Sequence, residues 1–369
     1  MVEWKIIGSL CKPITPPIKL GTADYQKEGL YPIIDQGQKA VVGYTDERNS
    51  LMPDNEYVLF GDHTRFVKYF KGQFAQGADG LKILLVNEEV VPRFFYYSFL
   101  NADIPSRGYS RHWSIAKEIL IPVPSFSEQT RIVGILDTFT ASIENLKQQI
   151  IERRKQYEYY RDQLLDLEGK EGVKMVALED MGPFFGGLTG KTKEDFVEGN
   201  AKFITYMNVF ANPALDISTT GVVRIKEGER QNKIQKGDIL FTGSSETPEE
   251  AGMSCVVTDD LTEDYYLNSF CFGVRLIHPE QYNLKYFKHI LRSYSVRKDI
   301  TRAASGVTRF NISKARFSKI KILIPSLQEQ SRIVSILDTF ETSIANLEAQ
   351  LELREKQYEY YRNKLLTFE

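Results

Sequence analysis

Residues 124–168 read PSFSEQTRIVGILDTFTASIENLKQQIIERRKQYEYYRDQLLDLE, and residues 325–369 read PSLQEQSRIVSILDTFETSIANLEAQLELREKQYEYYRNKLLTFE. The two stretches align without a gap at an offset of 201, and 28 of their 45 positions are identical. A repeat of this length indicates that one structural element is present twice. The chain is therefore divided into two long segments that have little sequence in common, each followed by one copy of the repeat.

Each copy carries the signals of a long helix. Ser125 with Glu128, and Ser326 with Glu329, match the capping box, in which the serine oxygen and the glutamate each satisfy a free backbone N–H. Apart from the opening prolines and Gly134, neither copy contains a residue that breaks helices. At 1.5 Å per residue, about 40 residues form a rod of about 60 Å.

Apolar side chains recur in each copy at alternating steps of four and three residues, broken only at Arg153 and Arg354. The first stripe consists of Ile132, Leu136, Phe139, Ile143, Leu146, Ile150, Tyr157, Tyr160 and Leu164. The second consists of Ile333, Leu337, Phe340, Ile344, Leu347, Leu351, Tyr358, Tyr361 and Leu365. A period of 3.5 residues specifies the seam of a left-handed coiled coil, so we expect the two helices to pair with each other. The alternative is that each helix packs on its own domain as an ordinary amphipathic helix.

Composition describes an ordinary globular protein of two or three domains. The 369 residues are 42% hydrophobic and 26% charged, with a net charge of −2. No apolar run approaches the length needed to span a bilayer, and the first residues lack the pattern of a signal peptide. Cys11, Cys255 and Cys271 are odd in number and lie outside any metal-ligand spacing, so we expect a cytoplasmic protein with reduced thiols.

The two variable segments predict two mixed α/β domains of the same plan. Strands are expected at residues 56–60, 66–70, 81–86, 176–178, 238–241, 254–257 and 270–276, and helices at 91–100 and 284–301. Before each repeat, Ile-Leu-Ile-Pro occurs at 119–122 and 322–325, and Phe310–Ile312 stands in the place of Trp113–Ile115. The predicted divisions are domain 1 at 1–123, the central helix at 124–168, a hinge at 169–172, domain 2 at 173–323 and the C-terminal helix at 324–369.

No motif predicts an active site or a metal site. The segment Gly186–Thr192 resembles a P-loop, but it has one residue too few before Gly190-Lys-Thr192. Asn212-Pro-Ala-Leu215 lacks the second proline and the aromatic residue of the DNA amino-methyltransferase motif. The four histidines, His63, His112, His278 and His289, show no pairing typical of a metal site or a nucleophile's base.

Because the Ile-Leu-Ile-Pro segment and the heptad helix both occur twice, the whole chain resembles a specificity subunit of type I restriction–modification systems. Phe60–Arg65, Gly77–Gly80, Gly237–Leu240 and Leu267–Phe270 also look like segments of that family's target-recognition domains. The resemblance implies an α+β fold, in which two target-recognition domains alternate with two long helices that pair as an antiparallel coiled coil. It also implies that each domain reads half of a bipartite, asymmetric DNA sequence, while the helices set the distance between the halves.

The same resemblance implies that this bacterial defence protein is not an enzyme by itself. Its partners would be double-stranded DNA, two modification (methyltransferase) subunits and restriction or translocase subunits, with no membrane involved. S-adenosylmethionine, ATP and Mg²⁺ would belong to those partners, and no cofactor is expected in this chain.

The residues expected to contact DNA lie mainly in the loop before each repeat. Arg, Asn, Gln and short hydroxyl side chains read base edges, whereas Lys and Arg hold phosphates. The loop residues are Arg107, Tyr109, Arg111 and His112 in domain 1, and Arg302, Ser305, Thr308 and Arg309 in domain 2. Arg65, Lys68, Lys191 and Lys193 are expected to contact the DNA backbone. The block of residues 285–321, with eleven Lys and Arg against Asp299 alone, indicates a positive field that attracts phosphates or a solvated helix face.

Two other functions remain open at this point. A DNA methyltransferase with a fused recognition domain would bind S-adenosylmethionine tightly. A coiled-coil scaffold without DNA would show no salt-dependent DNA binding.

Overall fold

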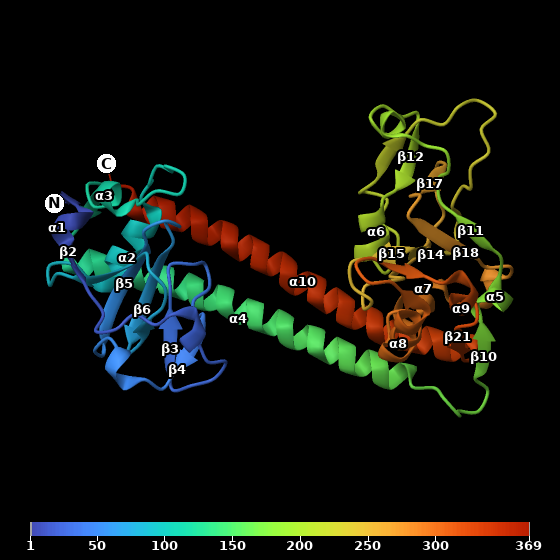
Figure 1. Cartoon of the computed structure of the whole chain (residues 1–369), viewed down its shortest axis with the longest axis horizontal. Helices are drawn as coiled ribbons and strands as arrows, with labels where there is room; N and C mark the ends of the chain where they lie inside the picture. The colour runs from blue at the N-terminus through green and yellow to red at the C-terminus, as the bar shows by residue number, and fades with distance from the viewer. Residues whose placement is uncertain (1, 369) are drawn as a thin grey trace. The chain divides into compact units, whose positions relative to one another are not determined.

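The computed structural model describes residues 2–368 and divides into two compact units. Unit 1 comprises residues 1–148 and 348–369, and unit 2 comprises residues 149–347. The helices α4 (Phe126–Leu165) and α10 (Leu327–Leu366) each contribute one segment to each unit (Figure 1). Among residues 2–368, no helix is both long and apolar enough to cross a lipid bilayer.

Unit 1 is built on a four-stranded antiparallel sheet of order β2-β8-β5-β6 and a three-stranded sheet of order β4-β3-β7. Its strands are β1 (Glu3–Ile6), β2 (Cys11–Ile14), β3 (Tyr31–Ile34), β4 (Gly43–Thr45), β5 (Asn55–Gly61), β6 (Val67–Gly72), β7 (Ala75–Gln76), β8 (Leu81–Val86) and β9 (Leu120–Val123). Its short helices are α1 (Ile7–Leu10), α2 (Pro92–Asn101) and α3 (Trp113–Ala116). The four-stranded sheet is buried on both faces: Val58 and Phe60 of β5 belong to one core cluster, and Tyr57 and Leu59 belong to another.

Unit 2 repeats this plan with different residues. Its four-stranded sheet has the order β11-β18-β14-β16 and its three-stranded sheet the order β13-β12-β17. The strands of these sheets are β11 (Phe184–Gly186), β12 (Ala201–Ile204), β13 (Gly221–Val223), β14 (Asp238–Thr242), β16 (Ser254–Val256), β17 (Tyr265–Leu267) and β18 (Cys271–Arg275). In each unit one pair of the three-stranded sheet is parallel, β3 with β7 and β12 with β17. The expectation of one plan used twice is therefore confirmed.

The remaining elements of unit 2 surround these sheets. The helices are α5 (Leu178–Met181), α6 (Tyr206–Ala211), α7 (Leu284–Ile290), α8 (Tyr294–Ala303) and α9 (Lys314–Phe317). The strands are β10 (Lys174–Ala177), β15 (Ser244–Ser245), β19 (Ala304–Ser305), β20 (Phe310–Ile312) and β21 (Lys321–Ile324). The helix expected over 284–301 is broken after α7, because the N–H and hydroxyl of Ser293 both bind the carbonyl of Ile290.

The strand that leads into each long helix is held by the first strand of the same unit. β1 pairs with β9 in unit 1, and β10 pairs with β21 in unit 2, both antiparallel. The elements α3 and α9, β9 and β21, and α4 and α10 all correspond at the offset of 201. Two sequence predictions are therefore wrong in register. Phe310–Ile312 lies four residues before the true counterpart of Trp113, and the two Ile-Leu-Ile-Pro segments are shifted by two residues, because they were matched by residue type alone.

The segments of α4 and α10 are antiparallel in each unit. In unit 1 the ring of Phe139 stacks on Tyr361 at 5.4 Å, and Lys147 lies 3.2 Å from Glu355. In unit 2 the ring of Tyr160 stacks on Phe340, again at 5.4 Å. The fold expected from the sequence, two α/β domains with two paired long helices, is confirmed.

The beginning of each long helix belongs to the core of its own domain. Ile132 and Leu136 are fully buried among side chains of the β-sheet and α2, and Ile333 and Leu337 are fully buried in the corresponding core of unit 2. The two interpretations of the apolar stripe therefore both describe part of it. The first turns anchor the domain, Phe139 and Tyr160 stack on rings of the other helix, and the later residues Tyr157 and Leu164 pack against the core of unit 2.

The two arginines that interrupt the apolar stripes lie over aromatic rings of the opposite helix. The Arg153 guanidinium is 5.9 Å from the ring centre of Phe340, and that of Arg354 is 5.7 Å from the ring centre of Phe139. A cation over an aromatic face is attracted by the ring quadrupole, so a charged side chain is accommodated where an apolar one was due.

The capping boxes form only in part. Ser125 Oγ accepts from the N–H of Glu128 at 3.4 Å, and Ser326 Oγ accepts from Glu329 at 3.3 Å. The glutamates bind instead the arginine three residues later, Arg131 or Arg332, with paired N–H···O contacts of 2.6–2.8 Å.

Candidate nucleic-acid interface

Three loops of unit 1 meet at the end of β5. The N–H of Asp62 donates to the carbonyl of Gly80, just before β8, at 2.7 Å. The N–H of His112, just before α3, donates to the carbonyl of Asp62 at 2.8 Å. The Asp62 carboxylate accepts from the N–H of Trp113 at 2.7 Å, which caps α3. This junction presents the 101–112 loop, where DNA contacts were predicted.

His112 supports the loop from inside. Its side chain is fully buried, one ring nitrogen accepts from the N–H of Arg107 at 3.1 Å, and the other lies 3.0 Å from the carbonyl of Asp62. Because Nε2 accepts, Nδ1 carries the proton and donates to Asp62. The prediction that His112 contacts DNA is therefore replaced by a structural role.

The other predicted residues of the loop, Arg107, Tyr109 and Arg111, are exposed. Tyr109 is 88% exposed, and its ring stacks on that of His63 at 4.9 Å between ring centres. The tyrosine is therefore held at a fixed angle while its outer face meets solvent. DNA contact by these three residues stays a prediction.

The two predicted backbone contacts of unit 1 are occupied within the protein. Arg65 has a left-handed backbone (φ 63°), and its guanidinium donates to the carbonyl of Ile104 at 2.8 Å. Lys68 donates to the carbonyls of Asp35 and Lys39 at 2.9 and 2.6 Å, and burial lowers the pKa of its ammonium group. Both cations hold neighbouring loops in place, which leaves them less suited to phosphate contact than the sequence suggested.

Unit 2 builds the same three-loop junction from different residues. The N–H of Gly243 donates to the carbonyl of Phe270, just before β18, at 2.7 Å, and the N–H of Ile312 donates to the carbonyl of Gly243 at 3.0 Å. Gly243 thus corresponds to Asp62, and Ile312 to His112. Unit 2 has one additional residue, Ser313, between this anchor and α9, so the offset is 200 here and 201 from α9 onward. Counting from these anchors, His63 corresponds to Ser244, and Tyr109 corresponds to Arg309.

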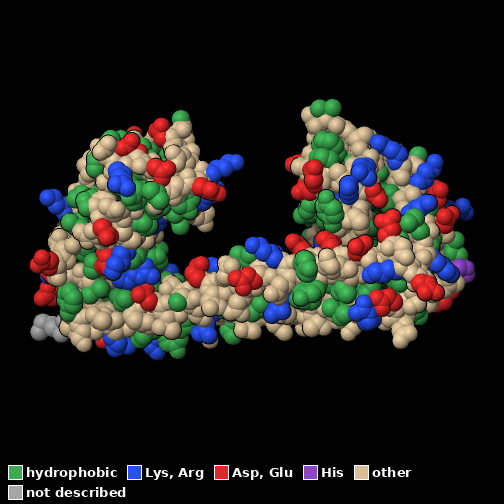
Figure 2. Space-filling view, turned by 90° about the horizontal axis from the view of Figure 1, so that it is seen from below, with side chains coloured by type: hydrophobic (Ala, Val, Ile, Leu, Met, Phe, Trp, Pro, Cys, Tyr) green, Lys and Arg blue, Asp and Glu red, His purple; other side chains and the backbone are tan. Residues whose placement is uncertain are grey.

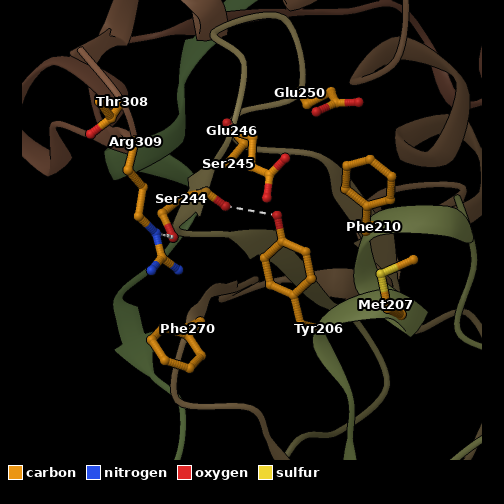
Figure 3. A pocket seen from close by; sticks show the side chains of 10 residues that line it. All are labelled: Tyr206, Met207, Phe210, Ser244, Ser245, Glu246, Glu250, Phe270, Thr308 and Arg309. Atoms are coloured by element: carbon orange, nitrogen blue, oxygen red, sulfur yellow. Dashed lines mark hydrogen bonds between the residues drawn. The ribbon is translucent and has the colours of Figure 1, made fainter. Parts of the chain in front are cut away.

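A cavity of about 490 Å³ opens at the junction of unit 2 (Figure 3). It is lined by Tyr206, Met207, Phe210, Ser244, Ser245, Glu246, Glu250, Phe270, Thr308 and Arg309. The Tyr206 hydroxyl donates to the carbonyl of Ser244 at 2.7 Å, which fixes α6 against the junction. The wall therefore combines aromatic rings with a few polar groups, as ligand sites commonly do.

Thr308 and Arg309, both predicted from the sequence, lie on the wall of this cavity. Ser305 is exposed on β19, and Arg302 is exposed at the end of α8 with its guanidinium 3.3 Å from Asp299. The structure thus brings Thr308 and Arg309 together with Ser244, Phe270 and Tyr206, which the sequence did not connect to them. The family-like segment Leu267–Phe270 was the one signal that could have included Phe270.

The lysines of the P-loop-like segment lie elsewhere in unit 2. Lys191 is almost fully buried, donates to Glu229 and to the carbonyl of Arg224 at 2.6 Å, and lowers the pKa of Glu229 to about 2. It is a structural residue, and its predicted contact with DNA phosphate is replaced by this internal ion pair. Lys193 is exposed in a short 3-10 helix (Lys193–Phe196) and stays a predicted phosphate contact.

Two arginines of the basic block at 285–321 are bound within the protein. Arg292 donates to the carbonyls of Ser254, Val209 and Phe210, and Arg297 donates to three carbonyls of the loop that precedes β16. Burial lowers the pKa of Arg297 to about 10. On the face drawn in Figure 2, basic side chains are interspersed with acidic ones over both units. Charge counting therefore overestimated the positive field of this segment.

His289 belongs to a buried polar cluster that the sequence did not indicate. Its Nε2 lies 3.2 Å from Asp338, and the Tyr157 hydroxyl lies 3.0 Å from its Nδ1. Lys288 binds Asp338 at 2.7 Å and Glu341 at 2.5 Å. His289, Asp338 and Glu341 have the donor types of a metal site, but both carboxylates are already bound by the Lys288 ammonium. The cluster instead joins α7 to α10 and α4.

Unit 1 has the corresponding attachment between α2 and α4. Asp137 binds the guanidinium of Arg93 at 2.8 Å and accepts from the hydroxyl of Tyr97, the counterpart of His289. Gln129 on α4 accepts from the N–H of Val91 at 2.8 Å, and Gln330 on α10 accepts from Asn283 at 2.9 Å. The attachment of domain to helix is therefore duplicated, whereas the exposed loops differ.

Two domains with the same topology, each followed by a copy of the same long helix, are the architecture of a protein with two recognition domains. The family described as "Type I restriction modification DNA specificity domain" matches residues 1–153 and 170–354. The chain belongs to this family of type I restriction–modification specificity subunits.

Curated relatives agree over the full length. The specificity subunit of the type I restriction enzyme EcoR124I/EcoR124II from Escherichia coli is 30% identical, covering 100% of this chain and 94% of the relative. A putative type I restriction enzyme specificity subunit from Haemophilus influenzae is 29% identical, covering 100% and 96%. These relatives are named as specificity subunits, which are the non-catalytic part of such enzymes.

Solved structures share the fold. The S subunit of a type I restriction–modification system from M. genitalium has a TM-score of 0.61 at 17% identity, covering 100% of this chain and 97% of that one. A second structure, from work on complex assembly and conformational transition of a type I system, has a TM-score of 0.60 at 15% identity, covering 99% and 96%.

Proposed function

We propose that each unit reads one half of a bipartite, asymmetric DNA site, and that α4 and α10 set the distance between the halves. The observation that carries this proposal is the three-loop junction, which occurs twice with the same backbone hydrogen bonds and different exposed side chains. Tyr109 on His63 and Arg309 on Ser244 occupy corresponding positions. Different side chains at one position on one scaffold are suited to reading different bases.

The partners are part of the same proposal. The chain docks two modification subunits, and restriction or translocase subunits join them, so that S-adenosylmethionine, ATP and Mg²⁺ are bound by those proteins. The family match supports this arrangement over the two open alternatives, a fused methyltransferase and a scaffold without DNA. A cytoplasmic site of action is supported by Cys11, Cys255 and Cys271, all buried free thiols.

The test lengthens the helices. One heptad inserted in the middle of both α4 and α10 adds about 10 Å, which corresponds to about three base pairs. Methylome sequencing of cells carrying the complete system should then show the same two half-sites with a spacer about three base pairs longer. A heptad in α4 alone leaves the seam unmatched and should abolish modification. An unchanged spacer in the double insertion would contradict the proposal.

A further inference from the structure

We propose that Arg309 reads a guanine in the half-site bound by unit 2, through the two outer nitrogens of its guanidinium. The inference rests on the proposed function and adds to it one residue, one base and one pair of base atoms. Guanine presents two acceptors, N7 and O6, in the major groove, and the arginine fork matches both.

The Arg309 side chain is held before any ligand arrives. Its Nε donates to the hydroxyl of Ser244 at 3.1 Å, and its guanidinium lies 5.3 Å from the ring centre of Phe270 (Figure 3). Ser244 is itself buried, and its backbone carbonyl accepts from Tyr206. One edge and one face of the guanidinium are therefore fixed by the protein.

The other edge of the guanidinium is available. Among the contacts between residues 2–368, Arg309 uses only Nε as a hydrogen-bond donor. The outer nitrogens, Nη1 and Nη2, are the pair that binds two acceptors side by side. Because the torsions of the side chain are already restricted, little conformational entropy is lost when these nitrogens bind a base.

The loop that carries Arg309 also makes a tight turn. Gly306 approaches the carbonyl of Arg309 so closely that a Cβ at position 306 would lie 1.9 Å from that oxygen. Ile312 and β20 tie the other end of the loop to Gly243 and β15. The arginine is therefore placed by a fixed turn rather than by a free chain end.

The charge of the cavity favours a base edge over a phosphate. Glu246 and Glu250 line the same cavity as Arg309. Carboxylates on the wall of the cavity repel a phosphate that enters it, whereas the edge of a neutral base carries no net charge. Phe270, 57% exposed, adds apolar surface next to the guanidinium.

The experiment uses the complex of this chain with its modification subunits. Methylome sequencing first gives the wild-type bipartite site. Arg309→Gln and Arg309→Lys are then compared with wild type, and Arg332→Gln on α10 is the control. Both Arg309 variants should lose discrimination by tenfold or more at a single guanine position of one half-site, while the other half-site is read as before. Lysine retains the charge but not the fork, so its failure separates base reading from phosphate contact.

Duplexes with 7-deazaguanine provide the second measurement, since this analogue lacks the N7 acceptor. Placed at the affected guanine, it should weaken binding of the wild-type complex about tenfold and leave binding of the Arg309→Gln complex unchanged. Unaltered reading of the other positions in the half-site bound by unit 2 shows in each case that the substituted unit is folded.

Three results would overturn the inference: a wild-type site without guanine in either half, a uniform loss of affinity on all sequences, or full function of Arg309→Lys. A wild-type complex that modifies no bipartite site would instead refute the proposed function itself.

Discussion

Units 1 and 2 are alike where they grip the long helices and different where they face a ligand. Gln129 and Gln330 donate to the carbonyls of Pro124 and Pro325, both at 2.9 Å. By contrast, Tyr109 on His63 and Arg309 on Ser244 occupy equivalent positions in the two units but make different contacts, a ring stack and a hydrogen bond. The difference teaches that the attachment is a fixed part of the molecule, while recognition is confined to a few side chains at a constant junction.

The largest expected effect tests the two attachments against each other. Asp338 is one of two carboxylates that bind Lys288, whose side chain is 10% exposed, so Asp338→Ala should cost about 2 kcal/mol of unfolding free energy. Asp137 is 43% exposed, and Asp137→Ala should cost about 1 kcal/mol.

Urea unfolding can separate the two units. Both tryptophans, Trp4 and Trp113, lie in unit 1, so fluorescence follows that unit, whereas circular dichroism follows both. Asp338→Ala should shift the dichroism curve and leave the fluorescence midpoint in place. Equal losses for the two variants would show that the attachments are energetically the same despite their different partners.

The next effect concerns the exposed tip of unit 1. Tyr109→Ala removes a ring held at a fixed angle on His63, and binding should weaken by about 1 kcal/mol through one half-site only. Competition with duplexes altered in either half-site measures this. Tyr109→Phe is the control, because it retains the ring. Loss of reading in the half-site assigned to Arg309 would break the correspondence between the two positions.

A smaller effect follows from His289, which stands where unit 1 has Tyr97. Burial lowers the pKa of His289 below its ordinary value of 6.5, although Asp338 and Glu341 act in the opposite direction. The unfolded chain then binds a proton more readily than the folded one. The contribution of neutral His289 to the free energy of unfolding is fully present above pH 6.5, and it is lost as the pH falls through 6.5 toward the pKa of the folded state.

The measurement is the midpoint of urea unfolding, followed by circular dichroism at pH values between about 7.5 and about 5.5, the range in which histidine titrates. His289→Gln places an amide, which does not titrate, between Tyr157 and Asp338, so the urea midpoint of this variant should change less with pH. An equally steep pH dependence in this variant would assign the acid sensitivity to other groups.

The long helices α4 and α10 could be predicted from the sequence because their apolar pattern is long, periodic and present twice. The sequence did not reveal that Ile132 and Ile333 belong to domain cores, because an apolar stripe does not state which surface covers it. Lys191 and Arg292 were counted as surface charge, although each is satisfied by carbonyls distant in sequence. Phe310 was matched to Trp113 by residue type, and this match was wrong. The correct alignment follows from the hydrogen bond between Ile312 and Gly243, which the sequence does not show.

The candidate site was predicted only where it lies in one loop. Arg309 and Thr308 were selected because a loop rich in small polar residues precedes the repeat. Ser244, Phe270 and Tyr206 come from three other segments, and only the folded sheet brings them to Arg309. Burial reversed the prediction for His112, because its neighbours Asp62 and Arg107 satisfy both ring nitrogens.

The smallest expected effect concerns the seam, where the units should be equal. Arg153→Ala and Arg354→Ala each remove a guanidinium from an aromatic face of the other helix and should cost about 0.5 kcal/mol. Dichroism reports the first variant, and tryptophan fluorescence reports the second. Lys155→Ala, at an exposed position of α4, is the control.

The matching leucine variants sharpen this comparison. A heptad seam prefers an apolar residue at these positions, so Arg153→Leu and Arg354→Leu should be at least as stable as wild type. If one arginine proved necessary for stability and the other dispensable, the two halves of the seam would contribute differently to the free energy of unfolding, although their sequences are repeated. Equal values would mean that the units differ only in what their exposed loops present to a ligand.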